Sequence, residues 1–231
     1  MKISIIIPTL NEEEKLPQLL DVLSKYTYTY EEIIIVDAKS TDKTVEIAKS
    51  YPKINVIEDH IPSRAKQMNT GAKAANGEVF YFIHADEIPP NSFEDDIRKF
   101  IKKGVDLGCY RFQFDKKAIP LKFNAWWTRF DFMFCRGGDQ TLFVKKSVFN
   151  ELDGFDPEYV IMEDFDFIRR ARKSFRFKII PKDVLVSARK YEHNSYFKVN
   201  MVNLWSYWTF MLGGSPERIK MNYKKWLKFE S

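Results

Sequence analysis

The sequence predicts an α/β fold, a mostly parallel sheet flanked by helices and followed by a helical C-terminal extension. Two observations support this prediction. Apolar, strand-like runs alternate with amphipathic segments through the first third of the chain, and short polar connections join them. The 231 residues, 45% hydrophobic and 30% charged, are enough for one well-packed domain. We expect residues 1–195 to form that domain and residues 196–231 to pack on it.

Four strands are predicted in the first third. Each is a nearly continuous run of Ile, Val or Phe, which is typical of strands buried on both faces of a parallel sheet. Right-handed crossovers bring the carboxyl ends of such strands to one edge of the sheet, where ligands bind. The four runs are residues 2–8, 31–37, 54–58 and 78–83.

Three helices are predicted between these strands. The first carries leucines at helical spacing over residues 16–23, and Asn11 can cap its N-terminus. The second follows the Ser-Thr-Asp run at residues 40–42, any of which can cap it. The third spans residues 63–75, with small and apolar side chains along one stripe.

The rest of the chain is less regular. An aromatic-rich stretch occupies residues 119–134, and the helical C-terminal segment contains three further tryptophans. A helix is expected at residues 163–173, and strands at residues 106–114, 140–144, 177–180 and 184–187.

Composition excludes several classes of protein. Two cysteines, Cys109 and Cys135, cannot build a disulfide framework or a four-thiolate zinc site. No apolar stretch approaches the roughly 20 residues of a membrane span, and the apolar run at residues 3–7 is too short for a signal peptide. We therefore expect a cytoplasmic protein, either free or held at the inner face of the membrane. A net charge of +5 admits nucleic acid, an anionic membrane or a phosphorylated small molecule as partner.

Two common phosphate-binding motifs are absent, which narrows the classes of nucleotide-binding protein that the chain could belong to. The chain has neither a Gly-x-Gly-x-x-Gly turn after the first strand nor a Gly-Lys-Ser/Thr loop, which argues against a dinucleotide-binding or P-loop protein. Polar residues instead follow the predicted strands at residues 9–12, at Asp37 and at residues 84–86. Carboxylates at such strand ends can accept hydrogen bonds from a nucleoside or bind a hard cation.

These motifs carry a resemblance. The run IIPTLNE at residues 6–12, then VDAKSTD at residues 36–42, then an acidic motif after the fourth strand resemble family 2 glycosyltransferases of the GT-A fold. The chain is most similar to a bacterial, radical-SAM-associated subgroup of that family. The markers of this subgroup stand at residues 64–72, 82–86, 138–140, 162–164 and 187–190.

The resemblance implies inverting transfer of a sugar from a nucleotide-diphosphate donor to a hydroxyl acceptor. It assigns acceptor or sugar contacts to Gly138, Asp139 and Gln140. It assigns nucleotide and donor binding to Pro8, Thr9, Asn11, Glu12, Asp37, Arg64, Asn69, Ala85, Arg189 and Lys190.

A divalent metal, Mn²⁺ or Mg²⁺, is the cofactor that the resemblance implies. Asp86 is the main predicted ligand, because hard cations prefer oxygen and can neutralise a departing diphosphate. His84 stands where the family has the first of two aspartates; it either assists the metal or hydrogen-bonds to backbone. His193 is a third candidate ligand, with an exposed surface histidine as the alternative, and Glu87 is a reserve ligand.

The catalytic residues are expected at the start of the helix at residues 163–173. The resemblance implies that Asp164 is the general base, with Glu163 as the supporting or alternative residue. Adjacent helical residues point about 100° apart, so only one of the two can aim at the reaction centre. Asp166 is a further carboxylate nearby and leaves the assignment open.

Two other functions stay open, a non-catalytic nucleotide-sugar-binding or scaffold protein and a nucleotidyltransferase. Nucleic-acid binding is not expected, because no known reader motif is present. The aromatic-rich stretch and the helical C-terminal segment have two possible structural roles. They either fill a core or a homodimer interface, or they form an apolar surface for a lipid-linked acceptor and peripheral membrane contact.

Overall fold

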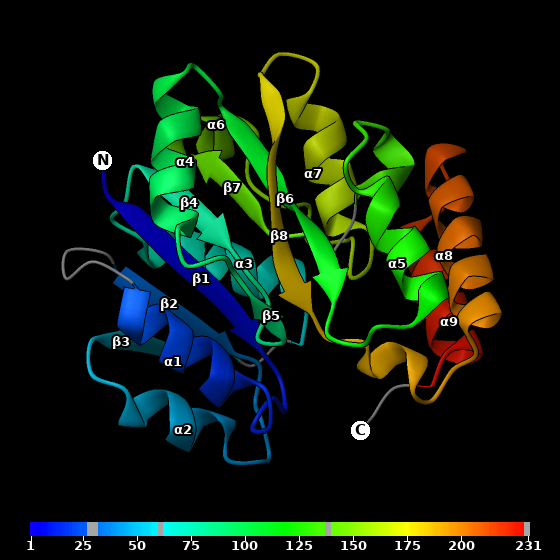
Figure 1. The fold of residues 1–231 in the computed structure, drawn as a ribbon, viewed down its shortest axis with the longest axis horizontal. Coiled ribbons are helices and arrows are strands. Elements are labelled where there is room, and N and C mark those ends of the chain that lie inside the picture. The colour runs from blue at the N-terminus through cyan, green and yellow to red at the C-terminus, as the bar shows by residue number, and fades with distance from the viewer. Residues whose placement is uncertain (27–31, 60–61, 137–139, 229–231) are drawn as a thin grey trace.

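In a computed structural model, the described residues are 1–26, 32–59, 62–136 and 140–228. Their strands form one eight-stranded sheet in the order β3-β2-β1-β4-β7-β6-β8-β5, with helices on both faces (Figure 1). The strands are β1 (Ile3–Thr9), β2 (Glu32–Asp37), β3 (Ile54–Glu58), β4 (Val79–Phe82), β5 (Glu87–Ile88), β6 (Leu107–Phe114), β7 (Leu142–Lys145) and β8 (Phe177–Val186).

The helices form two layers because side chains of the strands alternate between the two faces of the sheet. Helices α1, α2, α4 and α5 pack on the face that includes Ile5, whereas α3, α6 and α7 pack on the face that includes Ile6. The helices are α1 (Leu16–Tyr26), α2 (Thr44–Ser50), α3 (Arg64–Ala74), α4 (Phe93–Lys102), α5 (Ile119–Trp127), α6 (Lys146–Glu151), α7 (Glu163–Ala171), α8 (Tyr196–Met211) and α9 (Pro216–Trp226), with single 3₁₀ turns η1 (Met133–Cys135) and η2 (Arg189–Tyr191).

The predicted parallel arrangement is confirmed in one half of the sheet. Strands β3, β2, β1 and β4 are all parallel, and the register of β1 and β2 sets Thr9 opposite Asp37 at their carboxyl ends. The other half is mixed, because β7 runs antiparallel to both β4 and β6. The structure therefore brings the polar strand ends to one edge, as the sequence predicts.

Several local predictions were wrong or incomplete. Asn11 does not cap α1, since the helix begins at Leu16 and the Asn11 side-chain oxygen accepts a hydrogen bond from the Thr41 N–H at 2.9 Å. The two strands expected at residues 177–180 and 184–187 are one strand, β8, with a register shift opposite Tyr110 and Arg111 of β6. Strand β5 and helices α4 and α6 were not predicted.

The C-terminal helices pack on the rest of the chain. The Asn124 amide of α5 donates to the Asn200 side chain of α8 at 3.0 Å. The rings of Trp205 and Trp226 join α8 to α9, with centroids 4.7 Å apart. None of the described helices is both long enough and apolar enough to cross a membrane.

Gly108 provides a test of the β6–β8 contact. A Cβ atom at this position would overlap the Lys178 carbonyl of β8 and lie 2.7 Å from the Phe143 ring. We expect Gly108→Ala to lower the free energy of unfolding by about 1–3 kcal/mol, the usual cost of overpacking a core, as measured by urea denaturation. Gly213→Asn is the control, because its surroundings are open and Asn tolerates its φ of +76°. Equal stabilities of the two variants would contradict the observed packing.

Candidate active site

The ends of β1 and β2 are held together by a buried carboxylate. Asp37 is 1% exposed. Its side chain accepts hydrogen bonds from the Thr9 hydroxyl at 2.9 Å and the Ser40 N–H at 2.8 Å. Beneath it, the Gln67 amide of α3 donates to the carbonyls of Thr9 and Val36. Burial makes such a network costly to leave incomplete, so the geometry of this edge is fixed.

Further hydrogen bonds join the loop after β1 to the loop after β2. The Asn11 N–H donates to the Ser40 hydroxyl, and the Glu12 N–H donates to the Thr44 hydroxyl, both at 2.8 Å. Pro8 lies one residue before the end of β1, paired with Val36. The structure thus brings the predicted nucleotide-binding residues of both loops together. Their contacts with a base or ribose stay predictions.

Arg189 joins this edge to the predicted metal site. Its guanidinium makes two hydrogen bonds to the Glu12 carboxylate, at 2.8 and 2.5 Å, across 177 residues of sequence. Its Nε lies 3.3 Å from an Asp86 carboxylate oxygen. Burial raises the pKa of Glu12 above its ordinary value, while the bond to Arg189 opposes that change. One cation therefore serves two carboxylates that would otherwise repel each other.

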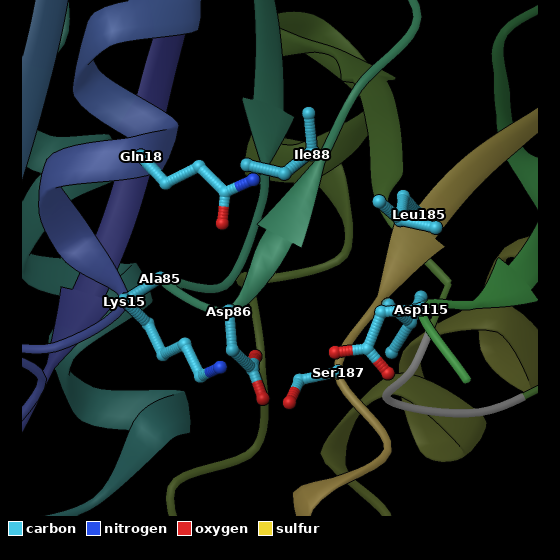
Figure 2. Close-up of a pocket in the computed structure, with 9 residues that line it drawn as sticks. Lys15, Gln18, Ala85, Asp86, Ile88, Asp115, Leu185 and Ser187 are labelled. Carbon is cyan, nitrogen blue, oxygen red and sulfur yellow. The ribbon is translucent and has the colours of Figure 1, made fainter.

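Asp86 lies in the tight turn between β4 and β5. The His84 N–H donates to the Glu87 carboxylate at 2.8 Å, and the Glu87 N–H donates back to the His84 carbonyl at 3.2 Å. Figure 2 shows the side chains of Asp86 and Ser187 pointing into one small hollow, with Lys15 at its side. The hollow, which Ala85 also lines, has a volume of about 50 Å³, room for a few water molecules rather than a nucleotide.

The three predicted metal ligands are not assembled into a cluster. Within the described ranges, no group of three His, Cys, Asp or Glu side chains is arranged to hold a metal ion. His193 is exposed. The Asp86 side chain is 20% exposed and offers oxygen atoms. A single carboxylate fits the way Mg²⁺ is usually bound beside a nucleotide, by one or two carboxylates together with phosphate oxygens and water. Asp86 alone therefore fits a metal ion that is bound together with a diphosphate. The predicted site made of three protein ligands is not supported by the described residues.

The acidic pair begins α7. Glu163 and Asp164 are 3% and 6% exposed. Met162, which precedes them, has a left-handed φ of 76°, a conformation that costs a non-glycine residue about 1–3 kcal/mol and often marks functional sites. Burial raises the pKa of Glu163, and the positive charge of Arg64 opposes this. The charge of Arg64 also opposes the rise in the pKa of Glu12, so it acts on both the acidic pair and the edge that carries Glu12.

Asp166 has a structural role. Its carboxylate accepts hydrogen bonds from Arg170 at 2.7 Å and from Arg169 at 3.1 Å. Arg170 in turn donates to the carbonyls of Leu152 and Gly154. Asp166 thus anchors α7 to the segment after α6, which argues against it as the catalytic base.

Asn69 anchors the same segment from α3. Its amide donates to the Phe155 carbonyl at 2.7 Å and accepts from the Phe155 N–H at 3.0 Å. A Cβ atom at Gly154 would lie 2.7 Å from the Asn69 oxygen, so this pairing requires glycine there. The structure gives Asn69 a positioning role, and the predicted nucleotide contact stays a prediction.

The remaining predicted residues lie elsewhere. Gly138 and Asp139 are outside the described residues. Gln140 is buried and accepts a weak hydrogen bond from the Cys109 thiol at 3.6 Å. The Lys190 ammonium lies 5.3 Å from the centre of the Tyr223 ring of α9. Sequence reasoning missed Lys15, although its position just after the first strand-end motif was a usable signal.

Comparison with known proteins decides the family. Residues 4–151 match the family model "Glycosyl transferase family 2". The chain belongs to this family. It is 32% identical over 108 residues to poly(ribitol-phosphate) beta-N-acetylglucosaminyltransferase TarS of Staphylococcus aureus, a match covering 44% of this chain and 19% of TarS. It is 26% identical over 239 residues to the O-antigen chain rhamnosyltransferase RfbN of Salmonella typhimurium, covering 90% of this chain and 74% of RfbN.

Solved structures confirm the GT-A fold of this chain. TarS 1–349 superposes with a TM-score of 0.69 at 21% identity, covering 84% of this chain and 62% of TarS 1–349. The mannosyltransferase PcManGT from Pyrobaculum calidifontis, in complex with GDP-Man and Mn²⁺, gives 0.67 at 19% identity, covering 88% of this chain and 61% of PcManGT. The chain thus spans less than two thirds of both structures and about a fifth of full-length TarS.

The buried Glu163 carboxyl should make the difference in stability between wild type and Glu163→Gln depend on pH. Because its folded-state pKa is raised, the folded chain binds a proton more tightly than the unfolded chain, and stability falls as pH rises from the ordinary pKa of 4.5 up through the raised folded-state pKa. We expect Glu163→Gln to raise Tm at pH 7.5, by about 2–4 °C for each kcal/mol in a chain of this size. The gain should shrink as pH falls toward about 4. Thermal unfolding across this range measures it.

Asp166→Asn is the matched control for that experiment. It removes the partner of Arg170 and should lower Tm at pH 7.5 instead. A Glu163→Gln gain that is absent, or that does not vary with pH, would contradict the raised pKa.

Proposed function

We propose that this glycosyltransferase is an inverting enzyme that moves a sugar from a nucleotide-diphosphate donor to a hydroxyl acceptor. The network of Glu12, Arg189 and Asp86 is the observation that carries the proposal, because it joins the edge proposed to bind the nucleotide to the carboxylate proposed to bind the cation. TarS has been solved with UDP and with UDP-GlcNAc, and PcManGT with GDP-Man and Mn²⁺. These relatives support a nucleotide-sugar donor for this chain.

The donor would lie along the edge formed by Thr9, Asn11, Glu12 and Asp37. Arg64 and Arg189 supply positive charge toward its diphosphate. Asp86 would hold Mn²⁺ or Mg²⁺, which supplies further positive charge against the departing diphosphate. The Nε of Arg189 lies 3.3 Å from the Asp86 carboxylate, so the guanidinium would stand beside the metal-bound phosphates of the donor.

The acidic pair would act on the acceptor. Asp164 would take the proton from the acceptor hydroxyl as its oxygen attacks the anomeric carbon, while the bond from that carbon to the diphosphate breaks on the opposite side. Asp164 would be the base and Glu163 a supporting group, since burial raises the pKa of Glu163 and so disfavours a charge on it. The anchoring of α7 through Asp166 would hold both in place.

Asp164→Asn tests the base. We expect it to reduce transfer by at least about 10²-fold, the usual contribution of a general base, with donor binding retained. Donor turnover is measured with UDP-GlcNAc and GDP-mannose as probes, and donor binding by calorimetry. The exposed acid Glu158, changed to Gln, is the control and should leave turnover unchanged. Near-normal turnover in Asp164→Asn would overturn the assignment.

Asp86→Ala tests the cation site. Titration of UDP or GDP with Mn²⁺ present should show binding weakened by at least about tenfold, equivalent to 1.4 kcal/mol, whereas binding in EDTA should change little. Asp183→Asn is the matched control, because Asp183 is an acid on β8 that pairs with Arg111 of β6. Equal nucleotide affinity with and without Mn²⁺ in both wild type and Asp86→Ala would contradict the proposed role.

The two alternative functions, a non-catalytic scaffold and a nucleotidyltransferase, predict different results in these assays. Donor binding by wild type without turnover would indicate a nucleotide-sugar-binding scaffold. Release of pyrophosphate from a nucleoside triphosphate would indicate a nucleotidyltransferase.

A further inference from the structure

Large hydrophobic side chains are exposed mainly at one end of the molecule. Of fourteen such residues in the described ranges, twelve lie within residues 119–134 and 197–221. These segments comprise α5, η1, α8 and α9, which stand together at the side opposite α4 and β3 (Figure 1). A concentration of exposed apolar side chains on neighbouring helices often marks an interaction site.

Helix α8 is apolar on two opposite sides. Its inner side buries Val199, Val202 and Phe210. Its outer side carries a stripe of exposed apolar side chains. They are spaced by four and three residues in turn, so they lie on one face of the helix. The stripe comprises Phe197, Met201, Leu204, Trp208 and Met211, and they are 78%, 65%, 50%, 55% and 41% exposed.

Helix α5 repeats this arrangement beside α8. Its inner residue Leu121 is 5% exposed, whereas Ile119, Phe123 and Trp126, again spaced by four and three, are 83%, 57% and 42% exposed. The Tyr196 hydroxyl of α8 donates to the Asn124 side chain of α5 at 2.7 Å, which holds the two helices together. We call the exposed stripes of α5 and α8 the aromatic face.

Charge distinguishes the occupants that this face could take. Helices α5, α8 and α9 together contain six basic residues and one acidic residue, Glu217. Two copies of the chain joined through this face would bring their positive charges together and repel. An anionic bilayer would instead attract the positive charges of each copy. Apolar aromatic side chains beside exposed lysines are typical of helices that lie in a membrane interface.

We propose that the aromatic face docks on an anionic lipid bilayer, with α8 lying along the surface rather than crossing it. Phe197 and Trp208 would enter the headgroup region, and Lys224 and Lys225 of α9 would pair with lipid phosphates. The docking rests on this face alone. Taken with the proposed transfer, it places the hydroxyl acceptor on a membrane lipid, because η2, which carries Arg189, leads directly into α8.

Vesicle co-sedimentation of the full chain tests the proposal. The vesicles contain phosphatidylcholine alone or with about one third phosphatidylglycerol. We expect wild type to bind the anionic vesicles, more weakly at high salt. F197Q/W208Q and K224Q/K225Q should each bind at least about tenfold more weakly. K99Q/K102Q, on exposed positions of α4, is the matched charge control and should bind like wild type. Circular dichroism checks that each variant is folded.

Three results would overturn the proposal. The first is no binding of wild type to anionic vesicles. The second is undiminished binding of folded F197Q/W208Q. The third is a wild-type dimer, found by light scattering, that F197Q/W208Q converts to a monomer while no form of the chain binds vesicles; that result would assign the face to a second copy.

Discussion

The ion pairs of Arg189 constrain the rest of the site. They connect the loop after β1, the turn after β4 and the segment after β8, so they join the parallel half of the sheet to the mixed half. Glu12 and Asp86 can lie close together only because a cation stands between them. A diphosphate and a divalent ion would bring their own opposite charges to the same place. Arg189 therefore lies between two carboxylates at the place where the proposed donor and its metal ion would bind.

A second constraint holds the acidic pair. Helix α7 is fixed through Asp166 and Arg170 to the backbone of residues 152–154, and Asn69 holds the next residue, Phe155, from α3. These bonds surround a short segment that ends in the left-handed Met162. A strained residue persists where its surroundings determine its conformation, and the Met162 side chain is buried against Phe210 and Ile219. Precision at Glu163 and Asp164 thus comes from residues that need not touch a substrate.

The parallel half of the fold was predictable, because β1, β2 and β4 are buried on both faces and appear in the sequence as nearly continuous apolar runs. Strand β8 was not, since Pro181, Lys182 and Asp183 interrupt its apolar pattern while a register shift accommodates them. Strand β5 has only two residues and no periodicity to detect. In the candidate site, residue types at strand ends predicted which polar side chains the fold brings to one edge of the sheet. The partners of Arg189 and Asn69 lie 177 and 86 residues away, and only the folded chain shows which groups pair.

The contact between Asn69 and Gly154 also bears on how this family varies. The amide of Asn69 fills the space that a side chain at position 154 would need. A residue other than glycine at position 154 would also have to adopt a φ of +70° and fit against the Phe149 ring, so a smaller residue at position 69 would not make it tolerable. A smaller residue at position 69 would only lose both bonds to Phe155. In an alignment of relatives that share this segment, glycine at position 154 should therefore persist where position 69 varies, and a lineage that has lost Asn69 must hold residue 155 by another contact.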